Sequence, residues 1–121
     1  MLESTPLHPC PCCGHLVFGE PPGSYNICPV CFWEDDVVQL RYPDHVGGAN
    51  ALSLVEAQRC YIQFGAMERR FMTHGRPAAA DEPLDDGWRP MGEADRRERF
   101  EPGAQDPWPE DPTALYWWRD T

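Results

Sequence analysis

The sequence contains no lysine. Its ten basic side chains are all arginine, and they stand against twenty acidic ones, which gives a net charge of −10. A protein with this balance repels a phosphate backbone and lacks the attraction that supplies most non-specific nucleic-acid affinity. The one arginine-rich segment, residues 96–99, is interleaved with acids. The composition therefore disfavours nucleic acid and favours a basic protein partner, which acidic charge would attract by electrostatic steering.

The sequence also lacks a long apolar run and a basic, then apolar, N-terminal segment. The first absence excludes a membrane-spanning helix, and the second disfavours a secretory signal. We therefore expect a cytoplasmic protein, in which cysteines are thiols or metal ligands rather than disulfides. At 121 residues the chain can bury only a modest core, so a structural metal would contribute much of its stability.

Five of the six cysteines lie within residues 10–31. The segment opens with Cys10-Pro11-Cys12-Cys13-Gly14 and closes with Cys28-Pro29-Val30-Cys31-Phe32, so each end reads Cys-Pro-x-Cys. Two such turns supply the four thiolates of a tetrahedral zinc site. The predicted ligands of Zn²⁺ are therefore Cys10, Cys13, Cys28 and Cys31.

The sequence allows other roles for the residues around these four. Cys12 lies between two ligands and is expected to point elsewhere, although it could exchange with a neighbour or act as a reactive thiol. His8 and His15 flank the first turn and could each replace a cysteine, and Cys60 is expected to be a packing residue. The alternatives to zinc are a disulfide pair and an iron site of the rubredoxin type, which would be coloured.

The residues between the two cysteine pairs favour a β-hairpin. Residues 15–18 and 25–27 have β character, and residues 20–24, Glu-Pro-Pro-Gly-Ser, are typical of a turn. Such a hairpin would return the second pair to the first, as in a zinc ribbon. Phe32 stands where a glycine would suit the second turn, so a slightly different geometry is expected there. Residues 37–40, Val-Val-Gln-Leu, suggest a further strand.

A helix is predicted over residues 54–64. Ser53 and Glu56 form a capping box, Gly65 is suited to the C-terminal end, and apolar residues recur at helical spacing. The expected buried face contains Leu54, Ala57, Tyr61 and Phe64. A short helical turn over 66–72 and a charged helix over 92–100 are also predicted.

The composition changes after residue 75, where seven of the fourteen prolines and four of the five tryptophans lie. Residues 106–112 contain too many prolines for a helix or a sheet ladder. Disordered tails seldom carry as many aromatics as residues 115–119, Leu-Tyr-Trp-Trp-Arg. We predict an α+β fold with a zinc-ribbon hairpin in residues 1–75, and a Pro/Trp-rich extension in residues 76–121 that docks back on it.

Several motifs in the same order resemble the bacterial cysteine-rich CPCC family. They are Cys10-Pro-Cys-Cys-Gly14, Glu20-Pro-Pro-Gly-Ser-Tyr25, Ile27-Cys-Pro-Val-Cys-Phe-Trp-Glu-Asp-Asp36 and Gly47-Gly-Ala-Asn50, followed by Ser53-Leu and Glu56-Ala. The similarity covers about residues 8–72. It implies a small zinc-ribbon-like domain without an established catalytic activity, of a kind also found in bacterial toxin–immunity gene clusters.

Three functions follow from these observations. The favoured one is a non-catalytic zinc-binding protein-interaction module, such as an immunity protein that neutralises a basic toxin. Its predicted partner site is Trp33, Glu34, Asp35 and Asp36. A nucleic-acid-associated zinc ribbon is the alternative. An enzyme using Asp35, Asp36, Asp44 and His45 as an acid–base set is a third, disfavoured because four cysteines close a zinc shell and no familiar catalytic motif is present.

Overall fold

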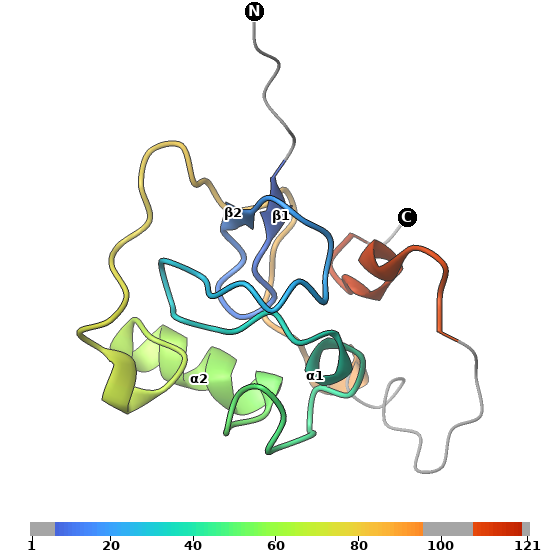
Figure 1. Cartoon of the computed structure of the whole chain (residues 1–121), viewed down its shortest axis with the longest axis horizontal. Helices are drawn as coiled ribbons and strands as arrows, with labels where there is room; N and C mark the ends of the chain where they lie inside the picture. Colours follow the sequence, from blue (N-terminus) through green and yellow to red (C-terminus); the bar gives the residue numbers. More distant parts are fainter. Residues whose placement is uncertain (1–6, 96–107, 120–121) are drawn as a thin grey trace, which may run out of the picture.

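The computed structural model describes residues 7–95 and 108–119 (Figure 1). The elements in this part of the chain are β1 (His8–Pro9), β2 (Leu16–Phe18), α1 (Val37–Arg41), α2 (Leu54–Phe64) and two short 3₁₀ helices, η1 (Arg69–Phe71) and η2 (Pro112–Leu115). β1 and β2 pair antiparallel, with a register irregularity between His8 and Pro9. The arrangement confirms the predicted small α+β fold of zinc-ribbon type.

The hairpin differs from the predicted one in its strand pairing. β2 pairs with β1 around the first cysteine turn, not with residues 25–27. Of the predicted strand over 25–27, only Ile27 forms a bridge, and its partner is Glu34 on the other side of the second turn. Each cysteine pair therefore lies at the tip of its own minimal hairpin. The longer strand pairing was expected because residues 20–24 have strong turn chemistry, but Tyr25 adopts a positive φ of 62°, which ends extended structure there.

α1 replaces the strand predicted over residues 37–40. Asp36 caps this helix, since its carboxylate accepts hydrogen bonds from the backbone N–H groups of Val38 and Gln39. Two adjacent valines favour a strand by propensity, but the cap satisfies helical N–H groups that a lone strand would leave unpaired. The strand prediction is therefore wrong.

α2 has the predicted bounds and the predicted ends. Both hydrogen bonds of the capping box between Ser53 and Glu56 are present, and Gly65 closes the helix in the left-handed conformation. Leu54 and Ala57 are fully buried, whereas Tyr61 and Phe64 are half-buried. The helical turn predicted over 66–72 is reduced to η1.

The C-terminal aromatics dock on the rest of the molecule, as predicted. Tyr116, Trp117 and Trp118 are all less than 8% exposed and belong to the same hydrophobic core as the cysteines. η2 contacts α1, and Trp108 packs edge-on against Tyr42. Residues 93–95 are helical, and the rest of the helix predicted over 92–100 lies outside the described residues. The predicted boundary between residues 75 and 76 stays a prediction.

Candidate metal centre

The two cysteine turns have the same backbone design. In the first, the N–H of Cys10 donates to the carbonyl of His15 at 2.9 Å, and the N–H of Gly14 donates to the carbonyl of Cys10 at 2.7 Å. In the second, Cys28 donates to Trp33 at 2.8 Å and Phe32 donates to Cys28 at 2.9 Å. The turns are thus two copies of one tight loop, which hold their cysteines in equivalent positions.

Phe32 adopts the same conformation as Gly14, although it carries a side chain. Its φ is +75°, against +83° for Gly14. The expectation of a different geometry at the second turn is therefore wrong. A non-glycine residue in this region costs on the order of 1 kcal/mol or more. Phe32 offsets that cost by packing against the rings of Phe71 and His74, with centroids 4.9 and 5.1 Å away.

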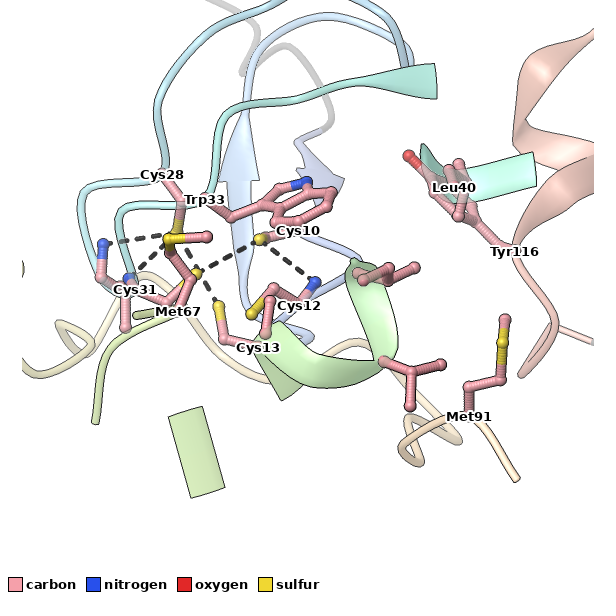
Figure 2. Packing of buried hydrophobic residues seen from close by; sticks show 14 of the residues in the cluster. Cys10, Cys12, Cys13, Cys28, Cys31, Trp33, Leu40, Met67, Met91 and Tyr116 are labelled. Atoms are coloured by element: carbon pink, nitrogen blue, oxygen red, sulfur yellow. Dashed lines mark hydrogen bonds between the residues drawn. The ribbon is translucent and has the colours of Figure 1, made fainter. Parts of the chain in front are cut away.

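The structure brings together the four predicted ligands, Cys10, Cys13, Cys28 and Cys31. Their sulfur atoms all lie within 4.8 Å of one another, and all four residues are buried (Figure 2). The Sγ atoms of Cys10 and Cys31 are 3.6 Å apart, and those of Cys13 and Cys28 are 3.8 Å apart. A tetrahedron of metal–sulfur bonds about 2.3 Å long has S···S edges of about 3.8 Å. The cluster therefore has the size and the donors that a tetrahedrally bound metal ion requires.

Backbone N–H groups point at the sulfurs from both turns. The N–H of Cys12 donates to Cys10 Sγ at 3.4 Å, and those of Val30 and Cys31 donate to Cys28 Sγ at 3.3 and 3.4 Å. These donors stabilise negative charge on sulfur. The predicted ligand cluster is thus prepared for thiolates as well as correctly spaced for a metal.

The electrostatics of the cluster differ among its thiols. Burial raises the pKa of the Cys10 and Cys31 thiols. Burial acts in the same direction on Cys28, but hydrogen bonds from the thiols of Cys10, Cys13 and Cys31 outweigh it and lower the pKa of Cys28. Burial opposes the ionisation of these thiols, so a dication is needed to stabilise four thiolates together in this interior.

The remaining cysteines and histidines lie outside the cluster. Cys12 is buried but is not among the four clustered sulfurs, and burial raises the pKa of its thiol. Cys60 lies half-buried in α2. His15 is engaged elsewhere, because its Nδ1 lies 2.7 Å from the carbonyl oxygen of Glu82. All six cysteines fall in the described part of the chain, and none forms a disulfide.

The predicted partner site, Trp33 to Asp36, is mostly buried and supports the fold. Trp33 is fully buried over the cysteine cluster, and Asp35 and Asp36 are 2% and 4% exposed. Asp35 accepts hydrogen bonds from the Ser24 hydroxyl and N–H, and burial raises its pKa against the effect of those bonds. Only Glu34 keeps a partly exposed side chain. These residues fix the second turn to the loops around it and do not form a continuous acidic surface.

A buried polar network beside the second turn was not anticipated from the sequence. The Asn50 side chain accepts from the N–H of Glu34 and donates to the carbonyl of Glu34, at 2.9 and 2.8 Å. Gln39 donates to the carbonyls of His45, Asn50 and Leu52 and accepts from Asn50. The motif Gly47-Gly-Ala-Asn50 was noted in the sequence, but the hydrogen bonds from Asn50 to Glu34 become apparent only in the structure.

Gly48 is required by this network. A Cβ at this position would lie 2.6 Å from Asp36 Oδ2, the oxygen that accepts a hydrogen bond from the Ala49 N–H. The loop can therefore approach the N-terminus of α1 only with a glycine there. Through Asp36 and Asn50, residues 47–50 hold both the start of α1 and the strand that leaves the second cysteine turn.

The fold and the cluster define a small cysteine-rich domain built around a four-cysteine metal site. The family model described as Cysteine-rich CPCC matches residues 8–82, more than half of the chain, and the protein belongs to this family. A comparison with curated proteins finds no significant match. Within the described residues, no helix combines the length and the apolar character that crossing a membrane requires.

Proposed function

We propose that the protein is a zinc-stabilised, non-catalytic protein-interaction module. The observation that carries the proposal is the four-cysteine cluster, because two identical turns place four buried sulfurs at the spacing of a tetrahedral site. Four protein ligands fill such a shell, whereas catalytic zinc sites keep a position for water or substrate. The ion in this proposal therefore holds the fold and performs no chemistry.

Zinc is favoured over iron by its preference for closed, structural tetrathiolate sites in small domains. Both ions fit the sulfur spacing. Purification under reducing conditions followed by elemental analysis distinguishes them, since the proposal requires one zinc per chain and a colourless protein. A visible charge-transfer spectrum with bound iron would overturn the assignment of the ion but not of the ligands. With all six cysteines unpaired, we also propose a reducing, cytoplasmic location.

An enzymatic role receives little support from the residues that were candidates for it. The carboxylate of Asp36 accepts three backbone N–H bonds, and that of Asp35 accepts two hydrogen bonds from Ser24. Carboxylates held in this way serve as caps and loop anchors. The backbone of His45 is tied to Tyr42 and Gln39 in the same loop.

The net charge of −10 supports a basic protein partner, because long-range attraction speeds the encounter of oppositely charged proteins. An immunity protein that binds a basic toxin is one form of this proposal. Affinity purification with the zinc-loaded chain, followed by mass spectrometry, should recover one basic protein whose binding weakens at high salt. Recovery of no specific protein would contradict the interaction proposal. Saturable binding of DNA or RNA in a fluorescence titration would favour the nucleic-acid alternative.

A further inference from the structure

A small pocket lies beside the second cysteine turn. Its cavity volume is about 70 Å³, and it is open to solvent. Its lining residues are Ile27, Phe32, Glu34, Ala49, Asn50, Ala51, Met67, Glu68, Arg70 and Phe71. This volume is well below that of pockets that enclose a cofactor, and a shallow opening of this size suits the end of one side chain. The pocket is therefore suited to receive a single residue of a partner protein.

The cysteine site sets the positions of the pocket walls. Phe32 follows Cys31 directly, and the N–H of Met67 donates to the carbonyl of Cys31 at 2.8 Å. Asn50 fixes Glu34 through both of its backbone polar groups. A metal bound at Cys31 thus holds two sides of the pocket, which gives the structural ion a consequence at the surface.

The pocket combines aromatic walls with two carboxylates. The ring centroids of Phe32 and Phe71 lie 4.9 Å apart. Ile27 extends this apolar surface and is 48% exposed. Glu34 has no ion-pair partner among the described residues. Oε1 of Glu68 is buried without a hydrogen-bond partner among them. The partly exposed carboxylate of Glu34 and the Oε2 atom of Glu68, which Arg70 contacts, offer acceptors to a ligand with several N–H groups.

The pocket already shows how a guanidinium group interacts with it. Arg70 pairs with Glu68 Oε2 at 2.6 Å, and its guanidinium carbon lies 4.5 Å from the centre of the Phe71 ring. Yet the Arg70 side chain is 65% exposed, and ion pairs this exposed are weak and readily exchanged. A second guanidinium could therefore share Glu68 or replace Arg70 there.

We propose that this pocket, residues 27, 32, 34, 67–68 and 70–71, binds an arginine side chain of the partner protein. The proposal rests on the proposed interaction function and specifies how the partner is recognised. Arginine fits better than lysine because its planar group can stack on a phenylalanine ring and bond to carboxylates at its edge simultaneously. Two carboxylates against one resident arginine leave the pocket negative, in agreement with the overall charge.

The test is an NMR titration of the zinc-loaded, ¹⁵N-labelled full chain with three blocked tripeptides, Gly-X-Gly, in which X is arginine, lysine or citrulline. Citrulline keeps the shape of arginine and removes its charge. The arginine peptide should shift the amide signals of Ile27, Phe32, Ala51 and Phe71. The lysine peptide should bind several-fold more weakly, and the citrulline peptide should give no saturable shift. Equal shifts with arginine and lysine, or shifts spread over the whole surface, would overturn the proposal.

Variants separate the pocket from general charge. Glu34→Gln and Glu68→Gln should each weaken arginine-peptide binding about threefold to tenfold, whereas Glu20→Gln removes the same charge from an exposed turn outside the pocket and should change nothing. Phe32→Gly retains a residue suited to positive φ, so it should keep the metal and reduce the preference for arginine over lysine. Unchanged binding of the arginine peptide in both glutamate variants would overturn the proposal that this pocket binds arginine. If those variants still bound a purified partner with wild-type affinity, the interaction function would stand without it.

Discussion

The indole ring of Trp88 lies directly over Gly14, the residue that closes the first cysteine turn. A Cβ on Gly14 would be 2.3 Å from Cδ2 of that ring. The N–H of Asp85, three residues before Trp88, donates to the carbonyl of Gly14 at 2.9 Å. Trp88 and Asp85 both lie beyond residue 82, where the family match ends. The C-terminal part of the chain is therefore packed directly against the metal-binding turn.

This contact predicts that Gly14→Ala is strongly destabilising. The variant combines a clash against a packed ring with a φ of +83°, and together these should cost about 3 kcal/mol. Thermal denaturation of the metal-loaded protein measures the effect. Gly65→Ala is the matched control, because Gly65 has φ +79° but open space at the Cβ position, so it should cost only about 1 kcal/mol. Equal losses in the two variants would show that Trp88 does not press on Gly14.

Asp85 anchors the C-terminal aromatics and should stabilise the fold as an anion. Its carboxylate accepts hydrogen bonds from Trp118 Nε1 at 2.8 Å and Arg119 Nε at 2.7 Å. Burial acts to raise the pKa of Asp85, but the hydrogen bonds from Arg119 and Trp118 outweigh it and lower this pKa. The stabilisation is therefore complete above the unfolded pKa of about 3.9 and is lost as the pH falls through the lower folded value.

Asp85→Asn should lower the free energy of unfolding by about 1 kcal/mol at pH 7. Because the wild-type carboxylate stays ionised, this difference should be constant between pH 8 and pH 5. Chemical denaturation of the two proteins, followed by tryptophan fluorescence, measures it. Below about pH 5 the difference should shrink, because the unfolded carboxyl takes up its proton before the folded one does. A difference that stays constant or grows between pH 5 and pH 3 would show that the pKa of Asp85 is not lowered.

The buried network around Asn50 makes a third prediction. Asn50→Ala would leave the N–H and carbonyl of Glu34 without their partners, at a cost of about 3 kcal/mol. Asn26→Ala is a suitable control, because Asn26 is exposed and its hydrogen bonds with other described residues use only its backbone. This change should be within about 0.5 kcal/mol. The melting temperatures of the two variants measure the difference. Equal melting temperatures would show that the Asn50 network does not stabilise the fold.

The fifth cysteine of the N-terminal segment gives a fourth prediction. Cys12 is outside the sulfur cluster, so Cys12→Ser should keep the metal stoichiometry of the wild type. Cys10→Ser should lose the metal and unfold, since metal binding in small zinc domains supplies on the order of 10 kcal/mol. Mass spectrometry under native conditions measures the number of metal ions bound per chain in both variants. Loss of the metal from the Cys12 variant alone would require a different ligand set.

Local signals in the sequence were enough to predict the best-defined elements. The capping box at Ser53 and the glycine at position 65 gave α2 with its correct ends, because both act within one helical turn. The two Cys-Pro-x-Cys motifs identified the four clustered sulfurs, because the turn that each motif favours is itself local. The density of tryptophan near the C-terminus indicated docking, since exposed aromatic surface is unfavourable in water.

The errors concern features that depend on distant partners. Asp36 and Asp35 looked like a charged surface, yet they are buried because Ala49 and Ser24, remote in sequence, supply hydrogen-bond donors. The strand pairing was not predicted correctly, because the β propensity of a segment is the same whether it pairs across a turn of four residues or across a longer loop. The placement of residues 83–85 along β2, where the Leu16 N–H donates to Pro83, leaves no periodic signal in the sequence.

Cobalt substitution tests most directly whether a tetrahedral metal site is formed by Cys10, Cys13, Cys28 and Cys31. Co²⁺ in place of the native ion should give one equivalent bound per chain, with the intense visible bands of tetrahedral cobalt and the near-ultraviolet charge transfer of four thiolates. Cys12→Ser should give the same spectrum. A spectrum that shows fewer than four thiolates in the wild type, or that is unchanged in Cys28→Ser, would contradict a site formed by these four cysteines.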